Sequence, residues 1–282
     1  MLLIDLNQVM ISNLMMQVGS SSKVKLDEGL VRHMVLNTIR TNVKNFRSYG
    51  KVVIACDNKK YWRREYFPNY KAGRKKVREA SVHDWALIFD CLNKIKQELI
   101  EFSPYTVLDI ERAEADDVIA VLAKTYSVTE KVMILSNDKD FVQLQTESNI
   151  EQYSPILKKK INTEDAEKFL KEMIIRGDAS DGIPNILSQD DIFLVEGKKQ
   201  GSITKKKMEQ WLIQKPEEFC NEEMLRNYSR NSQLIDFSYI PKELKKSIID
   251  RYEEVKPASK QSFLNYMIKN RLNNLMEVFD DF

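Results

Sequence analysis

Acidic side chains stand at the ends of several short apolar runs in this sequence. The clearest are Asp5 in the run 1–6, Asp57 after the run 51–56, and Asp138 after the run 131–135. If these runs are parallel strands of one sheet, the three carboxylates meet at one edge, where such sheets bind ligands. Crowded carboxylates repel one another and raise their own pKa values, and a bound divalent cation relieves that repulsion.

Further acidic residues fall close to the same predicted edge. They are Glu114, Asp116 and Asp117, where a helix should begin, and then Asp140, Asp178 and Asp181. A single aspartate after a strand is commonly a turn or helix-cap residue, so each position alone indicates little. Together the acidic residues predict a site for Mg²⁺ or Mn²⁺, which prefer oxygen ligands. Two such ions about 3.5–4 Å apart can clamp the attacking water and the leaving oxygen of a phosphodiester.

Residues 59–78 combine cations with aromatic rings. They contain nine Lys and Arg against one acid, and they include Tyr61, Trp62, Tyr66, Phe67 and Tyr70. Basic side chains neutralise phosphates and aromatic faces stack on bases, so the stretch is typical of a surface for single-stranded nucleic acid. The alternative is a solvated charged face whose aromatic residues, Trp62 and Phe67 above all, pack in the core.

Strand and helix patterns alternate through the first half, which predicts an α/β fold with a mainly parallel sheet. We expect a strand at 1–6 followed by a polar stretch, a helix over 26–49 that Gly50 ends, and a strand at 51–56. Ser81 and Asp84 resemble a capping box that opens a helix to about residue 100. A strand at 106–110, a helix from about Glu114 and a strand at 131–135 follow.

Past about residue 181 the strand patterns fade. Short charged helices are expected at 203–213, 216–227 and 241–254, so this part should be mainly helical. The 282 residues are 43% hydrophobic and 30% charged, as in a soluble globular protein. No apolar run approaches the roughly 18 residues of a membrane span, and three scattered cysteines argue against disulfides and zinc. We therefore expect a cytoplasmic protein that does not bind membranes, and by default a monomer.

The acidic segments resemble, in order and spacing, the five motifs of the 5′-nuclease superfamily, which includes flap endonucleases and the 5′-nuclease domain of bacterial DNA polymerases. They read Leu-Ile-Asp5-Leu-Asn, Cys-Asp57-Asn, Glu114-Ala-Asp116-Asp117, Ser-Asn-Asp138-Lys-Asp140 and Arg-Gly-Asp178-Ala-Ser-Asp181. The likeness covers residues 1 to about 185. The residues at 61–64 and 234–241 are most similar to the ribonuclease H branch of tailed phages. This resemblance implies a protein of the infected host cytoplasm.

The resemblance implies a 5′ to 3′ exonuclease and flap endonuclease that uses two Mg²⁺ ions, with Mn²⁺ as a substitute. It assigns Asp5, Asp57, Glu114, Asp116 and Asp138 to the first metal region, and Asp140, Asp178 and Asp181 to the second, with Asp117 nearby. Lys71 and Arg74 are expected to contact the scissile phosphate, and Asp138 to be essential for catalysis. The implied substrates are branched or nicked DNA and RNA–DNA hybrids, cut to remove RNA primers and 5′ flaps in replication.

The resemblance also implies two parts of the chain. These are a nuclease core at 1–185, with a helical arch at about 59–100 that is poorly ordered around 60–80 without DNA, and a helical duplex-binding part at 186–282. Expected contacts in the arch are Arg63, Arg64, Lys71, Arg74, Lys75 and Tyr70, the last by stacking on a terminal base. Expected phosphate contacts beyond Pro184 are Lys198, Lys199, Ser202, Thr204, Lys205, Lys206 and Lys207. Residues 187–197 replace the family's glycine-rich turn, so its monovalent-cation site lacks the usual sequence here.

Other interpretations of the same residues stay open at this stage. A phosphatase of the haloacid-dehalogenase type needs a second aspartate where Asn7 stands. A small toxin-like ribonuclease would lack the basic stretch and the C-terminal helices. A non-catalytic junction-binding protein would bind branched DNA without cutting it. The last residues, 274–282, form either an ordinary last helix or a docking peptide for a sliding clamp or a single-strand-binding protein.

Overall fold

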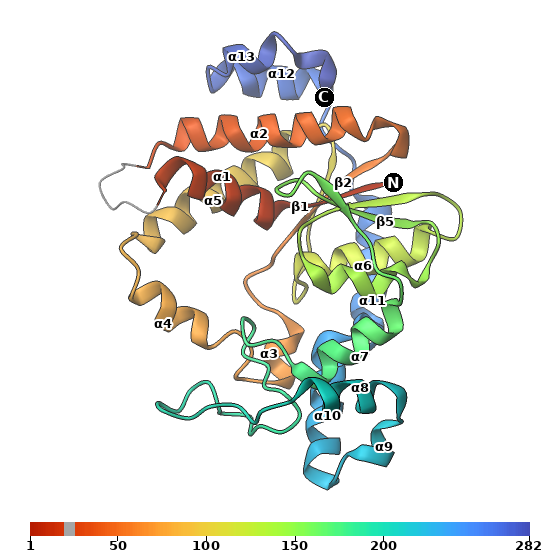
Figure 1. Cartoon of the computed structure of the whole chain (residues 1–282). Helices are drawn as coiled ribbons and strands as arrows, with labels where there is room; N and C mark the ends of the chain where they lie inside the picture. The colour runs from red at the N-terminus through yellow and green to blue at the C-terminus, as the bar shows by residue number, and fades with distance from the viewer. Residues whose placement is uncertain (20–25) are drawn as a thin grey trace.

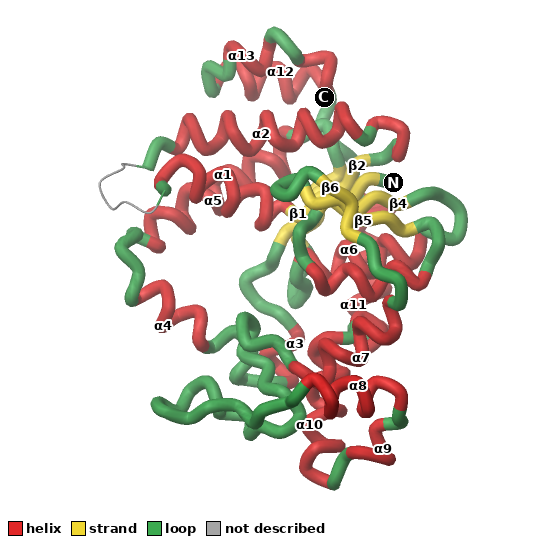
Figure 2. The backbone as a smooth tube through the Cα atoms, viewed as in Figure 1, coloured by secondary structure: helices red, strands yellow, loops and turns green. Residues whose placement is uncertain are grey.

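The computed structural model describes residues 1–19 and 26–282, and one six-stranded sheet organises them. The sheet order is β3-β2-β1-β4-β5-β6, and Figure 2 shows the strands gathered beside the helices. The strands are β1 (Leu2–Asp5), β2 (Val52–Cys56), β3 (Thr106–Asp109), β4 (Val132–Leu135), β5 (Ile150–Ser154) and β6 (Lys159–Ile161). All neighbours pair in parallel except β6, which runs antiparallel to β5. The predicted α/β class with a mainly parallel sheet is confirmed.

The central strands are apolar throughout because helices cover both faces of the sheet. Leu2 and Ile4 of β1 pack into the core on one face and Leu3 into the core on the other. On the first face lie α1 (Leu6–Val18), α2 (Glu28–Asn45), α5 (Trp85–Phe102) and α12 (Lys260–Lys269). On the second lie α6 (Ala115–Tyr126) and α11 (Lys242–Glu254), as Figure 1 shows.

The strand order places the ends of β1 and β4 side by side. Successive strands are added outward from β1 through β2 to β3, and then on the other side from β4 to β5. The order therefore reverses between β1 and β4, and such a switch point is where open α/β sheets bind ligands. Asp5 ends β1 and Asp138 follows β4 closely, so the topology alone brings two of the predicted acids to this crevice.

The C-terminal part is helical, as predicted. It contains α8 (Lys205–Ile213), α9 (Pro216–Phe219), α10 (Glu222–Ile235) and α13 (Asn273–Met276) besides α11 and α12, and it follows α7 (Ala166–Arg176). Short 3₁₀ helices are η1 (Arg47–Tyr49), η2 (Lys139–Thr146), η3 (Phe237–Tyr239) and η4 (Phe279–Asp281). The chain then returns to the sheet: Phe282 is buried in the same core as β1, and Asp281 pairs with Arg40 at 2.5 Å. The last residues are thus packed in this structure, which favours the last-helix interpretation over a free docking peptide.

Two expectations about local structure are wrong, and one element was not predicted. The stretch after β1 is helix α1, because the Asp5 side chain caps it by accepting the Gln8 N–H at 3.1 Å. Helix α5 begins after Asp84, whose side chain accepts the Leu87 N–H, so Ser81 is not the cap. The hairpin of β5 and β6 had no prediction.

The arch segment is described throughout and contains α3 (Trp62–Tyr66) and α4 (Gly73–Glu79). Its mobility without DNA stays a prediction, and so does the boundary near residue 185. Among the described helices none is long and apolar enough to cross a membrane.

Candidate active site

Asp5 is buried at the end of β1, and its hydrogen bonds fix the position of its carboxylate. One carboxylate oxygen accepts the Gln8 N–H, and the other accepts the Ser136 hydroxyl at 3.1 Å. Burial raises the pKa of Asp5 to about 7, and the nearby charges of Asp57 and Asp138 act in the same direction. The buried position at the strand end therefore disfavours the ionised form of this carboxyl group.

Asp57 connects the end of β2 with the start of α6. Its carboxylate accepts the Ala115 N–H at 2.8 Å and the Asn7 side-chain amide. An acidic side chain at the first turn of a helix is favourable because the free N–H groups there carry partial positive charge. Burial nevertheless raises the pKa of Asp57, while the charge of Lys71 opposes that shift.

Asp138 lies between two groups of carboxylates. Burial and then repulsion from Asp138 and Asp5 raise the pKa of Asp116 well above its usual range. Burial and then repulsion from Asp138 and Asp178 do the same to the pKa of Asp140. The two predicted metal regions therefore meet at Asp138, whose own pKa is raised by burial and by Asp181 and Asp178.

Two glycines hold the loop that brings Asp178 and Asp181 to the crevice. Gly177 has φ +65°, and a Cβ there would lie 2.4 Å from the Ile183 carbonyl oxygen. Gly182 has φ +73°, and a Cβ would lie 2.9 Å from the Asn69 carbonyl oxygen. No side chain fits either approach, so this sequence needs glycine on both sides of the acidic pair. Asp178 closes the turn by accepting the Ser180 N–H at 2.7 Å.

The crevice is not a ready-made cage. In the described ranges, no three Asp, Glu, His or Cys side chains close around one point at ligand distances. The donor chemistry is nevertheless that of a hard cation, since all the donors are carboxylate oxygens that repel one another. Mg²⁺ commonly keeps several waters and binds through a few carboxylates, so a wide acidic rim fits it better than a tight cage.

Glu114 and Asp117 belong to a buried network behind the crevice. They are 1% and 0% exposed, and Nη1 of Arg63 lies 2.9 Å from an oxygen of each. Asp117 also accepts the Glu114 N–H at 2.9 Å and the Trp62 indole N–H at 3.2 Å. Its oxygens thus have protein partners, and the structure speaks against a direct metal ligand at Asp117.

Arg63 and Tyr70 are buried rather than open to nucleic acid. Arg63 is 3% exposed and donates to the Leu234 carbonyl, while Tyr70 is 3% exposed among apolar side chains. The Tyr70 hydroxyl lies 3.0 Å from oxygens of both Glu114 and Asp181. The phosphate contact at Arg63 and the base stacking at Tyr70 stay predictions that this burial does not favour. Trp62 and Phe67 are buried too, as the alternative for this stretch expected of its aromatic residues.

Lys71 and Arg74 meet the acidic crevice from the arch. Lys71 Nζ lies 2.5 Å from Glu114 and 3.5 Å from Asp181, and Arg74 pairs with Asp181. Burial alone would lower the pKa of Lys71, but the charges of Glu114 and Asp181 outweigh it and raise the pKa. Lys71 therefore keeps its charge. Its backbone has φ 57° and its N–H donates to the Asp181 carbonyl at 2.7 Å, which joins the two segments directly.

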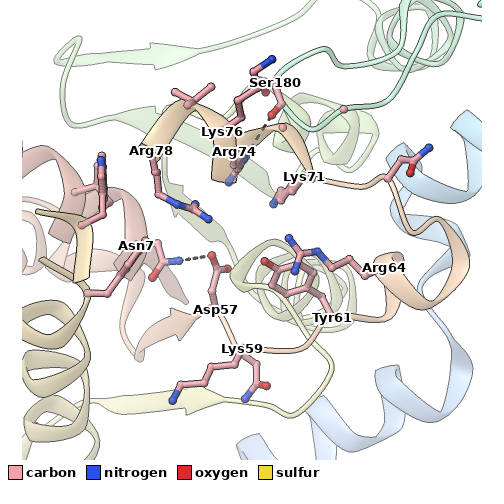
Figure 3. A pocket seen from close by; sticks show the side chains of 18 of the residues that line it. Asn7, Asp57, Lys59, Tyr61, Arg64, Lys71, Arg74, Lys76, Arg78 and Ser180 are labelled. Atoms are coloured by element: carbon pink, nitrogen blue, oxygen red, sulfur yellow. Dashed lines mark hydrogen bonds between the residues drawn. The ribbon is translucent and has the colours of Figure 1, made fainter. Parts of the chain in front are cut away.

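A cavity of about 1200 Å³ runs between the arch and the sheet edge. Of the predicted residues it is lined by Asp57, Arg64, Lys71 and Arg74, whereas Lys75 is an exposed side chain elsewhere on α4. Figure 3 shows Asp57 on one side of this space and Lys71 and Arg74 on the other. Further lining residues are Tyr61, Lys76 and Arg78, which belong to the basic, aromatic stretch 59–78, and Asn7 and Lys96, which the prediction missed.

Some of those missed residues carried a signal in the sequence and others did not. Asn7 follows Asp5 by two positions, so a strand-end motif could have included it. Lys96 lies inside α5, and only the fold shows that it pairs with Asp109 at 2.6 Å and donates to the Asp57 carbonyl at 3.2 Å. That pair neutralises Asp109, the acid at the end of β3, and separates it from the crevice.

The predicted duplex contacts lie at the end of the loop that follows Pro184 and in the first turn of α8. Lys198, Lys199 and Ser202 are exposed, and Thr204 caps α8 by accepting the Lys207 N–H at 3.3 Å. Lys205, Lys206 and Lys207 form the exposed first turn of that helix. The arrangement is open to a phosphate backbone, and the contacts stay predictions.

Comparisons with known proteins agree with this architecture. Residues 1–174 match the family described as the 5′-3′ exonuclease N-terminal resolvase-like domain, and residues 165–282 match the T4 RNase H C-terminal family. The chain is 34% identical to ribonuclease H of Enterobacteria phage T4 over 99% of this chain and 95% of that protein. It is 34% identical to flap endonuclease Xni of Shewanella woodyi over 44% of this chain and 49% of that protein.

A solved structure of T5 5′-exonuclease with bound zinc superposes with a TM-score of 0.64 over 91% of this chain and 99% of that one. At 17% identity this likeness shows the fold alone. The family matches and the full-length similarity to the T4 enzyme together show the relationship. The chain therefore belongs to the 5′-3′ exonuclease family of nucleases, in the branch with a T4 RNase H-type C-terminal part.

Proposed function

We propose that the protein is a structure-specific 5′-nuclease that hydrolyses phosphodiester bonds with two Mg²⁺ ions, for which Mn²⁺ can substitute. The observation that carries the proposal is the meeting of carboxylates and cations where the arch reaches the sheet edge. Asp57, at the end of β2, lines the cavity together with Lys71 and Arg74, and both cations lie against Asp181. A second hollow, lined by Asp138, Asp140 and Asp178, shares Gln8 with the cavity. A polyanion and the cations that bridge it to acidic residues need this combination.

The residues divide the work by their positions. Asp5, Asp57, Asp116 and Asp138 would hold the first ion, with Glu114 behind them, and Asp140, Asp178 and Asp181 would hold the second. When bound, the ions lower the pKa of an attacking water and stabilise charge on the phosphate. Lys71 and Arg74 would orient the scissile phosphate, since their flexible cationic ends already lie at the crevice. In this arrangement Asp117 supports the site by holding Arg63 and Trp62.

The proposed substrates are branched or nicked DNA and RNA–DNA hybrids. Removal of RNA primers and 5′ flaps during replication is the proposed role, supported by the names of the relatives: ribonuclease H, 5′-3′ exonuclease and flap endonuclease. Several structural neighbours are described with divalent metal ions or with DNA. The exposed lysines near α8 are suited to the duplex backbone, which basic side chains contact without reading sequence.

The test is cleavage of a 5′-labelled flap duplex with Mg²⁺, with EDTA, and by an Asp138→Asn variant. Short 5′ products in Mg²⁺ alone are expected, and the variant should lose at least about 100-fold in rate because Asp138 is shared by both carboxylate groups. Glu111→Gln, at an exposed acid outside the crevice, is the matched control and should cleave normally. Tight binding of the flap duplex without any products in Mg²⁺ or Mn²⁺ would instead support the non-catalytic junction-binding protein.

A further inference from the structure

The cavity beside the acidic crevice is lined by aromatic rings as well as cations. Trp85 and Phe89 lie one turn apart on α5, with ring centroids 5.7 Å apart and planes inclined by 38°. Both side chains line the cavity, as do the cations Arg74 and Arg78. The Arg78 guanidinium lies 5.4 Å from the centre of the Phe89 ring, so a cation and a ring face adjoin each other.

Trp85 packs partly against the main core, whereas Phe89 is largely outside it. Phe89 is 40% exposed, and the indole N–H of Trp85 has no hydrogen-bond partner in the described part of the chain. An unsatisfied donor is a cost to the folded state, and a half-exposed phenylalanine contributes only part of its area to the core. Rings held at a cavity in this way are available to a ligand.

The same cavity reaches the acidic crevice. Asp57 and Asn7 line it together with Trp85 and Phe89, and Figure 3 shows Asp57, Arg74 and Arg78 around one open space. A ligand that contacts the rings can therefore extend to the acids without leaving the cavity. Cations that suit phosphates, rings that suit bases and a path to the crevice match a chain of unpaired nucleotides.

Resting on the function proposed above, we propose that Trp85 and Phe89 form a stacking site for the unpaired bases of a 5′ flap. Arg74 and Arg78 hold the phosphates of the same segment. Bases in a duplex stack on one another and do not present their faces to a protein, so the site accepts only single-stranded ends. It adds affinity for flaps and none for a nick that has no flap. Because every base has a π face, DNA and RNA flaps should both use it.

The test compares Phe89→Ala and Trp85→Ala with Leu87→Ala. Leu87 lies on the same helix, is 52% exposed and does not line the cavity, so it controls for loss of an exposed apolar side chain. Dissociation constants are measured in EDTA by fluorescence anisotropy for a nicked duplex with a 5′ DNA flap, with an RNA flap, with an abasic flap and with no flap. Each aromatic variant should bind the DNA-flap and RNA-flap duplexes roughly 5- to 100-fold more weakly. The flapless and abasic substrates should be unaffected, and Leu87→Ala should change all four by less than about twofold.

Three results would overturn the stacking site. They are unchanged binding of both base-containing flaps, an equal loss on the flapless duplex, and an equal loss on the abasic flap. Thermal melting checks that each variant is folded, and Phe89, being half exposed, keeps the test decisive if Trp85→Ala does not fold. Cleavage in Mg²⁺ is measured beside binding. If the aromatic variants lose flap binding as expected but the wild-type protein does not cleave the flap, the nuclease proposal is refuted and the stacking site is supported.

Discussion

Four consecutive residues, 114–117, contribute to two regions that differ in whether the acids have cationic partners. Glu114 and Asp117 lie in the buried network, where Arg63 and Lys71 compensate their charges. Asp116 lies in the crevice, where the neighbouring groups are mostly further acids and burial with repulsion raises its pKa. Because residues three apart share a helix face and a residue between them does not, one helix start supplies both regions.

The comparison shows how the backbone of an acidic site can be fixed while some of its carboxylates lack cationic partners. In the network, burial tends to raise the pKa of Glu114, but Lys71 and Arg63 more than offset it and the pKa is lowered. In the crevice, no ion pair to Asp140 forms within the described residues, and burial with repulsion from Asp138 outweighs the charge of Arg63, so the pKa of Asp140 stays raised. The paired region fixes the backbone at the start of α6. The unpaired region is left with a repulsion that a divalent cation would remove.

The largest expected effect comes from breaking the paired region. Arg63→Ala leaves Glu114 and Asp117 buried without their shared cation, and such a loss typically costs about 3–5 kcal/mol of unfolding free energy. Urea unfolding measures it. Arg64→Ala is the matched control, because Arg64 is the exposed neighbour on the same helix and should change stability by less than about 0.5 kcal/mol. Equal effects of the two substitutions would show that the network does not stabilise the fold.

A second prediction concerns the unpaired region and pH. The pKa of Asp5 is raised from 3.8 to about 7, so between these values the folded chain keeps a proton that the unfolded chain has released. The contribution of Asp5 to the free energy of unfolding is fully present below the lower pKa. It falls as pH rises between the two pKa values, by at most about 1.4 kcal/mol per pH unit for one group. Denaturation in EDTA across this range measures the slope.

Asp5→Asn should reduce that pH dependence by the share of one group, because other crevice acids with raised pKa values remain, and Glu111→Gln, at an exposed acid, should leave it unchanged. A stability that instead rises with pH across the same window in the parent protein would contradict the raised pKa. Mg²⁺ should weaken the dependence, since metal binding displaces the protons that the crevice holds.

The third prediction separates metal affinity from stability. Asp140→Asn removes one of several crevice carboxylates and should weaken Mg²⁺ binding by about tenfold, as measured by calorimetry. The metal-free protein should be no less stable, because a repulsive charge has gone. Asp117→Asn should show the reverse pattern, a loss of stability at the hydrogen bonds to Trp62 and Glu114 with a smaller change in direct metal affinity. If Asp117→Asn instead weakened Mg²⁺ binding and Asp140→Asn lowered the stability, Asp117 would be the metal ligand.

Much of the architecture was predictable because it rests on local patterns. Apolar runs at β1, β2 and β4, helical periodicity in α2, and the strand-helix alternation sufficed for the α/β class and the parallel sheet. Helix α1 was missed because Asp5 was considered only as a strand-end acid, although it also caps the helix. The β5–β6 hairpin was missed because its strands are short and carry polar residues at an edge.

The sequence by itself determined which acids and cations the chain owns, and that several acids stand at strand ends. Only the tertiary structure decided which charges are paired. From the sequence, Arg63 was expected to contact a phosphate. In the structure α3 packs against α6 and α10, and a buried guanidinium there requires acidic partners. Trp85, Phe89 and Arg78 are distant from Asp57 in the chain, and only the fold places them around one cavity with it. Spacing along the chain sets local caps and periodicity, whereas desolvation and charge pairing depend on neighbours that only the folded chain brings together.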